Sequence, residues 1–119
     1  MFTVGAATRI YLATGATDLR QGYNGLYAQV KSRLGREPLS GDLYVFCNQR
    51  RESLKIFFWD GSGLCVFGKR LQKGTFRWPG AGESTVVMTA TQLQLLLSGI
   101  DLKHTKPRAW WRHQMINNS

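Results

Sequence analysis

The sequence is poor in acidic residues. Its 119 residues contain only 7 Asp and Glu against 16 Lys and Arg, which leaves a formal net charge of +9. The isoelectric point is near 10.2. A charge of this sign and size is typical of proteins that bind polyanions, because their surfaces attract phosphate groups. We therefore expect nucleic acid as the default partner.

The sequence also has few cysteines and no long apolar run. Both cysteines, Cys47 and Cys65, lie inside short apolar segments, and a chain that is 43% apolar needs no disulfide framework. We expect two buried free thiols. No uncharged apolar stretch approaches the roughly 18 residues of a membrane span, and the start of the chain lacks a signal-peptide pattern. These two features predict a cytoplasmic protein that does not contact membranes.

The usual signatures of cofactor, metal and nucleotide sites are missing. Each acidic residue has a position typical of a turn, a loop or a helix end. His104 and His113 stand nine positions apart without a nearby cysteine, which matches no zinc spacing. The glycine pairs at 22–25 and 61–63 lack both the lysine of a phosphate-binding loop and the three glycines of the dinucleotide fingerprint. We expect no cofactor, no metal and no catalytic residue.

The length allows one domain, and its first part predicts a strand and a helix. Residues 9–14 are typical of a strand that ends at Gly15. Thr17 and Asp18 then suit a helix start, and Gly35 suits a helix stop. Six apolar residues at helical spacing predict one buried face: Leu19, Tyr23, Leu26, Tyr27, Val30 and Leu34. Glycines at 22 and 25 indicate either close packing or an irregular helix start.

The second part changes to a period of two. Strands are predicted at 43–48, 54–59, 64–67 and 75–78, with turn residues between them, of which 60–63 is the strongest hairpin signal. A last strand is predicted at 85–88. Thr89 and Gln92 fit a capping box, and the helix that follows would bury Leu93, Leu96, Leu97 and Ile100.

This order of elements predicts a single α+β domain over residues 1–102. We expect an antiparallel β-meander of about 4–6 strands packed against two helices. Residues 103–119 carry four basic residues, both histidines and no acid. They have no steady period, and we interpret them as a basic tail whose end is flexible.

The basic residues cluster in the predicted meander. Seven Lys and Arg but only two acids lie between Arg50 and Arg77. The cations predict contacts with phosphates. The aromatic residues between them either stack on unpaired bases or belong to the core, and the pattern leaves both open. The residues that we predict to contact nucleic acid are Arg50, Arg51, Lys69, Arg70, Lys73 and Arg77. The tail at 103–113 could likewise contact DNA or dock Trp110 and Trp111 onto a partner protein.

The longest motif runs from Trp59 to Leu71, with the sequence WDGSGLCVFGKRL, and is followed by Gly74, Phe76, Trp78 and Pro79. With Thr17–Leu26 and the segment 91–101, it closely resembles the small accessory proteins called TnpB of insertion-sequence-66-type bacterial transposons. The resemblance covers roughly residues 8–102. Gln21 stands where this family often has lysine, so we do not count the helix start among the DNA contacts.

The resemblance implies a non-catalytic accessory role in DNA transposition, beside a separate and larger transposase. Together with the charge, it favours a protein that binds transposon DNA through phosphate contacts. The alternative is a protein-interaction module that recruits or bridges the transposase, or another protein of the element, without binding DNA itself. A third reading is a small metal-dependent nuclease, which would need carboxylates that converge in space.

Overall fold

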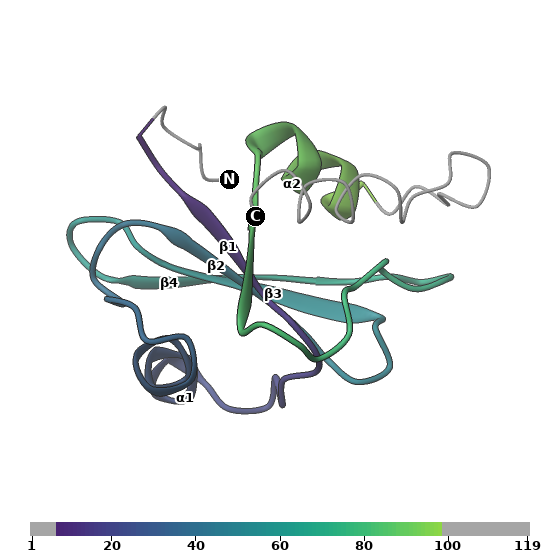
Figure 1. Cartoon of the computed structure of the whole chain (residues 1–119), viewed down its shortest axis with the longest axis horizontal. Helices are drawn as coiled ribbons and strands as arrows, with labels where there is room; N and C mark the ends of the chain where they lie inside the picture. Colours follow the sequence, from purple (N-terminus) through teal and green to yellow (C-terminus); the bar gives the residue numbers. More distant parts are fainter. Residues whose placement is uncertain (1–6, 99–119) are drawn as a thin grey trace.

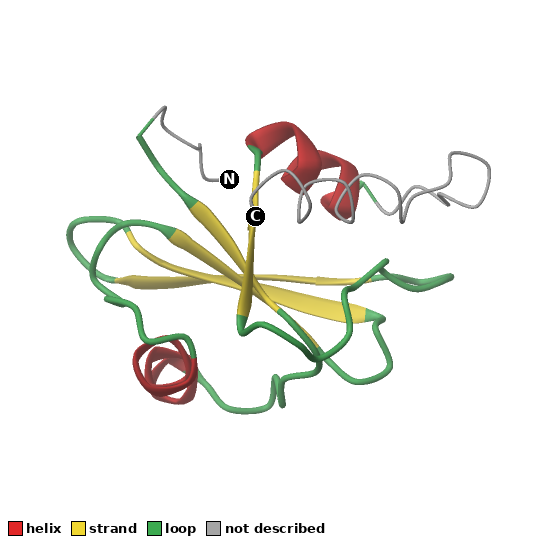
Figure 2. Ribbon diagram, viewed as in Figure 1, coloured by secondary structure: helices red, strands yellow, loops and turns green. Residues whose placement is uncertain are grey.

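The computed structural model describes residues 7–98, which form one five-stranded sheet with a helical segment on each face (Figure 1). In chain order the elements are β1 (Ile10–Ala13), α1 (Tyr23–Ala28), η1 (Gln29–Arg33), β2 (Leu43–Cys47), β3 (Ser53–Trp59), β4 (Leu64–Arg70), β5 (Thr85–Met88) and α2 (Ala90–Leu97). The two helices lie on opposite sides of the sheet (Figure 2). The predicted α+β class with two helices is confirmed.

The sheet is mixed, with the strand order β4-β3-β2-β1-β5. The predicted meander is confirmed for β2, β3 and β4, because β3 pairs antiparallel with both β2 and β4. β1 also pairs antiparallel with β5, but it pairs parallel with β2, with Ile10 opposite Leu43. Side chains alternate in the same way in parallel and antiparallel strands, so the sequence pattern could not distinguish the two directions.

Each face of the sheet has its own apolar core. On the α2 face, Ile10, Val45 and Ile56 pack with Leu93 and Leu96. The α1 face has a second cluster, which consists of Tyr11, Ala13, Leu19, Leu26, Val30, Leu34, Tyr44, Phe46 and Phe57. Because neighbouring residues of a strand point to opposite faces, the central strands β1 and β2 are buried at every position.

The first helix is shorter than predicted. The chain is irregular from Gly15 to Gly22, α1 begins at Tyr23, and its last turn widens into the π-helical turn η1. Asp18 does not cap the helix, because its carboxylate accepts a hydrogen bond from the main-chain N–H of Arg20 at 3.0 Å and so closes a local turn. Tyr23, expected on the buried face, is 54% exposed. The structure therefore has the irregular helix start that the glycines indicated, and it also has close packing at Gly25, where a Cβ atom would clash with the side chain of Gln21.

Residues 75–78 were wrongly predicted as a strand. The segment has no regular pairing, although the main-chain N–H of Phe76 donates to the carbonyl of Arg51 at 2.7 Å. Its alternating pattern reflects burial of two rings: Phe76 and Trp78 lie in the α2-face core, and the indole N–H of Trp78 donates to the carbonyl of Ala13 at 2.9 Å. An extended segment can bury alternate side chains without joining a sheet.

Both cysteines are free, as predicted. Cys47 is fully buried in β2, and burial raises the pKa of its thiol to about 12. Cys65 is only half-buried, so the expectation of burial was wrong for this residue. Within residues 7–98, no helix is long and apolar enough to cross a membrane. The predicted tail at 103–119 lies outside the described residues.

The capping box at the start of α2 gives a test of the fold. The hydroxyl of Thr89 accepts from the N–H of Gln92 at 3.1 Å, and the Gln92 side chain accepts from the N–H of Thr89 at 2.8 Å. Thr89→Ala removes the first bond and is expected to lower the free energy of unfolding by about 1 kcal/mol, measured by urea denaturation. Thr91→Ala, at an exposed position two residues further on in the first turn of α2, is the control and should not destabilise the protein. Equal midpoints for Thr89→Ala and wild type would contradict this prediction.

Candidate nucleic-acid interface

A groove of about 890 Å³ lies at one edge of the sheet, where four separate segments meet. Its lining comes from the segment 16–20, the turn at 48–50, the start of β3 and the end of β4. The residues are Ala16, Thr17, Asp18, Leu19, Arg20, Asn48, Gln49, Arg50, Ser53, Leu54, Lys55, Gly68, Lys69 and Arg70.

The strand directions bring these segments together. β1 and β2 are parallel, so their carboxyl ends reach the same edge of the sheet and their following loops, which contain residues 16–20 and 48–50, lie next to each other. The main-chain N–H of Thr17 donates to the carbonyl of Cys47 at 2.8 Å, which fastens the first loop to the end of β2. β3 begins and β4 ends at this same edge, because Ser53 pairs with Arg70.

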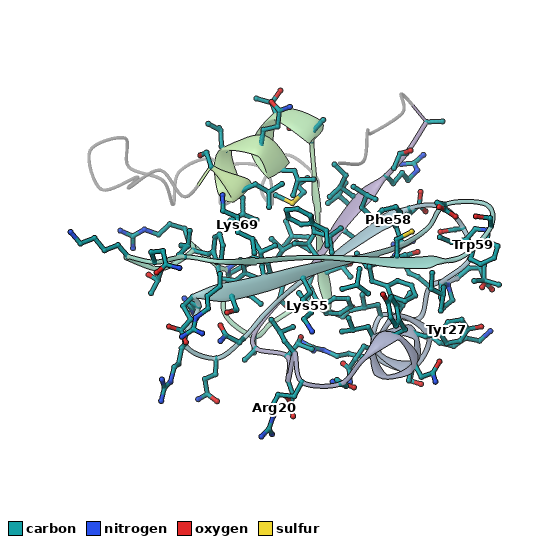
Figure 3. All side chains as sticks on the ribbon, turned by 180° about the vertical axis from the view of Figure 1, so that it is seen from behind. Arg20, Tyr27, Lys55, Phe58, Trp59 and Lys69 are labelled. Atoms are coloured by element: carbon teal, nitrogen blue, oxygen red, sulfur yellow. The ribbon has the colours of Figure 1, made fainter. Side chains whose placement is uncertain are left out.

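Lys55 connects two parts of the groove lining, namely β3 and the loop segment 16–20. It lies on the α1 face of β3, and its ammonium donates to the carbonyl of Leu19 at 2.7 Å. Figure 3 shows Lys55 on the side of the sheet that faces Arg20. A lysine ammonium has three donors, and this bond uses one of them. Lys55 therefore holds the loop segment 16–20 in place, and its charged ammonium group lies in the groove.

The turn at 48–53 presents Arg50 to solvent. The side-chain oxygen of Asn48 accepts from the N–H groups of Glu52 at 3.1 Å and Ser53 at 3.2 Å. Arg51 takes the left-handed conformation, with φ of 62°. This tight turn leaves the Arg50 side chain exposed, without a hydrogen bond or ion pair to any other part of the described chain.

The lining of the groove is strongly cationic. Five of its residues are basic, namely Arg20, Arg50, Lys55, Lys69 and Arg70, and the acid among them is Asp18. Asp18 pairs with Arg20 at 2.9 Å, and the two side chains are 53% and 91% exposed. Hydrogen bonds from Arg20 lower the pKa of Asp18 to about 2, so this carboxylate is charged at neutral pH. Even so, positive charge exceeds negative charge along the groove.

Three of the six predicted contact residues line this groove: Arg50, Lys69 and Arg70. Arg50 and Arg70 are exposed. Lys69 borders the groove, but its ammonium donates to the carbonyl of Leu97 in α2, on the opposite face of the sheet. Figure 3 accordingly shows Lys69 on the α2 side of the sheet. Arg50 and Arg70 are thus the two predicted residues whose side chains are available at this site.

The other three predicted residues do not line the groove. The guanidinium of Arg51 donates to the carbonyl of Trp78 at 3.1 Å and so holds the segment 75–78 against the sheet. Lys73 is exposed in the turn after β4, and Arg77 is half-buried between the two core aromatics Phe76 and Trp78. The structure therefore does not bring all six cations to one place.

Two cations of the groove were not among the six. Lys55 stands in the predicted basic region. Alternation places it on the face of β3 opposite to Leu54 and Ile56, which is the less apolar face, and this signal could have selected it. Arg20 lies in the predicted helix start, which was not counted among the DNA contacts because Gln21 stands where the family often has lysine. Its place depends on the loop that replaces the first helical turns, which the spacing of apolar residues does not reveal.

The aromatic residues of the basic region are mainly structural. Phe57 is 0% exposed, Phe76 3% and Trp78 4%, while Trp59 is half-buried at the far end of β3. Of the two readings that the sequence left open, core packing applies to these three buried rings. None of the described residues that line the groove is aromatic. Across residues 7–98, no three His, Cys, Asp or Glu side chains are grouped so that they could hold a metal ion.

The fold and the groove define a small α+β protein with a cation-lined groove at one edge of a mixed sheet. A family model described as IS66 Orf2 like protein matches residues 8–107, and so includes every element of the structure. The chain belongs to this family, which confirms the predicted identity as an IS66-type transposition accessory protein.

Two curated proteins are similar to this chain over most of their length. The chain is 41% identical over 112 residues to "Uncharacterized protein y4hO" of Sinorhizobium fredii (strain NBRC 101917 / NGR234), which covers 94% of this chain and 96% of the relative. It is 38% identical over 98 residues to "Uncharacterized protein y4jC" of the same strain, which covers 82% of this chain and 84% of the relative. No solved structure matches the chain.

The neighbouring arginines 50 and 51 should differ in their effect on stability. Arg51→Ala removes the bond to Trp78 and is expected to lower the free energy of unfolding by about 1–2 kcal/mol. Arg51→Gly loses the same bond but removes the cost of the left-handed conformation, so it should be about 1 kcal/mol more stable than Arg51→Ala. Arg50→Ala should stay within about 0.5 kcal/mol of wild type. Chemical denaturation measures all three, and equal losses at 50 and 51 would show that Arg51 does not have this structural role.

Proposed function

We propose that the protein assists transposition of an insertion-sequence-66-type element by binding DNA through phosphate contacts in the basic groove, beside a separate transposase and without catalysing a step itself. The observation that carries this proposal is the convergence of Arg20, Arg50, Lys55 and Arg70 from four different segments on one groove. Membership in the IS66 Orf2-like family supports the transposition context.

The electrostatics favour phosphate as the ligand. Arg50 and Arg70 carry exposed guanidinium groups, which match phosphate oxygens with two parallel hydrogen bonds. Asp18 balances only one of the surrounding cations, and the whole chain adds a net charge of +9. Binding of this kind releases counterions from DNA, so its free energy depends strongly on salt.

The chemistry of the lining favours contacts that do not depend on base sequence. Base-specific contacts in duplex DNA need side chains on an element that enters a groove of the DNA, usually a helix or a β-ribbon. The cations here lie in a concave edge of the sheet instead, and cations at such positions contact phosphates, which fix position but carry no sequence information. We infer a protein that binds many DNA sequences with similar affinity.

Salt dependence tests the proposed function. If about four phosphates are neutralised, affinity for a transposon-end duplex should fall on the order of 100-fold between 50 and 200 mM salt. Filter binding or fluorescence anisotropy measures this directly. A matched duplex of unrelated sequence should bind within a few-fold of the transposon end. Affinity that stays constant across this salt range would contradict phosphate binding.

Substitutions in the groove locate the contacts. Arg50→Ala and Arg70→Ala should each weaken binding roughly five- to tenfold and reduce the salt slope by about one. Lys31→Ala, in η1 and outside the groove, removes the same unit of charge and should change affinity less than twofold. If all three variants lost affinity equally, net charge rather than the groove would explain binding.

The alternative proposal is a protein-interaction module that recruits or bridges the transposase. Under the proposed function, a pull-down of the element's larger proteins by the purified chain should weaken strongly after nuclease treatment, because DNA mediates the contact. An interaction that survives nuclease treatment unchanged, together with the absence of salt-dependent DNA binding, would instead support the alternative.

A further inference from the structure

At Gly68, the main chain of β4 lines the groove without a side chain to cover it. This glycine lies in the interior of β4, pairs with Lys55 and is exposed in the groove. A Cβ atom at this position would meet only the Cγ atom of Lys55, at an ordinary contact distance of 3.9 Å. Its φ does not lie in the left-handed region. Neither packing nor backbone conformation therefore requires glycine here.

A glycine inside a strand has a cost. It loses more conformational entropy on folding than other residues and offers no side chain to pack, whereas β-branched residues favour such positions. A glycine that the fold does not require often marks a place where another molecule or chain approaches the backbone closely. The open space over Gly68 belongs to the groove, so the approaching group would be the ligand of the groove.

The charged neighbours of Gly68 indicate which kind of ligand group would approach it. Arg70 lies two residues further along β4, on the same face of the sheet, and is exposed. Lys55 lies directly across, with its ammonium fixed at Leu19. A bare main chain between two cations suits an anionic group that must come close to the sheet. Single-stranded sites commonly use aromatic platforms for stacked bases, and the described lining of this groove has none.

We infer that Gly68 is a ligand-contact residue: the sugar–phosphate backbone of DNA lies directly on the main chain of β4 at Gly68, with its phosphates between Lys55 and Arg70. This inference rests on the proposed function and specifies which part of the ligand enters the groove and where. It makes the absence of a side chain at position 68 a requirement for binding rather than for folding.

Side chains at position 68 test the inference. Gly68→Gln fills the space and is expected to weaken DNA binding about tenfold. Gly68→Glu has the same size but adds a negative charge beside Lys55 and Arg70, and should weaken binding at least a further tenfold at 50 mM salt. Gly68→Lys adds a cation and should bind better than Gly68→Gln. If all three variants bind within twofold of wild type, the inference is wrong.

The control is Gly63→Gln. Gly63 lies in the turn before β4, at the other end of the β3–β4 pair, and a Cβ atom there would meet nothing within 4 Å. The Gly63→Gln variant should bind DNA with the same affinity as wild type. Thermal unfolding of the Gly68 variants should be unchanged or shifted upward, because the new residues are less costly in a strand than glycine. Gly68→Ala, which adds one methyl group, should fold like wild type and bind between wild type and Gly68→Gln.

Two DNA probes test whether the groove binds the sugar–phosphate backbone of duplex DNA, of single-stranded DNA or of both. Duplex DNA and single-stranded oligo-dT of equal length share the phosphate chain, and Gly68→Gln should weaken both if only this chain enters the groove. A loss confined to one probe supports the inference and assigns the groove to that form of DNA. If wild type binds neither probe in a salt-dependent way, the proposed function fails as well. If wild type binds but the Gly68 series has no effect, only this inference fails.

Discussion

The parallel pairing of β1 and β2 is the constraint on which the rest of the structure depends. Parallel neighbours cannot be joined by a tight turn, so the chain between Ala13 and Leu43 must cross one face of the sheet. This crossover carries α1 and η1, and their apolar residues Leu26 and Val30 cover Phe46 and Phe57. The same pairing places the carboxyl ends of both strands at one edge. The α1-face core and the groove therefore have a common origin.

The groove shows how structural and electrostatic roles combine in one side chain. Lys55 reaches from β3 to the carbonyl of Leu19 and stabilises the loop that forms the wall. Arg33 supports the same loop from η1, because its guanidinium donates to the hydroxyl of Thr17 at 2.8 Å. These two cations are held by neutral oxygen acceptors rather than by carboxylates, so their positive charge is not cancelled. The loop is thus fixed in place without loss of the basic character of this edge.

Cations that look equivalent in the sequence have different surroundings in the structure. Arg50 and Arg51 are neighbours, yet the first is exposed beside the groove and the second holds the main chain at Trp78. Lys69 and Arg70 are also neighbours, and alternation along β4 sends their side chains to opposite faces of the sheet. A strand or a tight turn separates adjacent side chains in this way. Clustering along the chain therefore overestimates clustering in space.

Local chemistry allowed several elements to be predicted from the sequence. The hairpin at Asp60 forms because its carboxylate accepts from the N–H groups of Ser62 and Gly63, and the start of α2 forms because Thr89 and Gln92 satisfy each other's main-chain donors. Alternation likewise predicted β2 and β3 within one residue of their bounds. The first helix was less predictable, because its start depends on the contact of Thr17 with β2 rather than on neighbouring residues.

The sequence by itself determined the family, the excess of positive charge, the α+β class and the local turns, because these depend on composition and on residues close together in the chain. Only the tertiary structure decided the parallel pairing of β1 and β2, the core position of Trp78 and the meeting of Arg20, Arg50, Lys55 and Arg70 at one groove. Strand direction and the face that each side chain occupies decide these features. Both depend on contacts between segments that lie tens of residues apart.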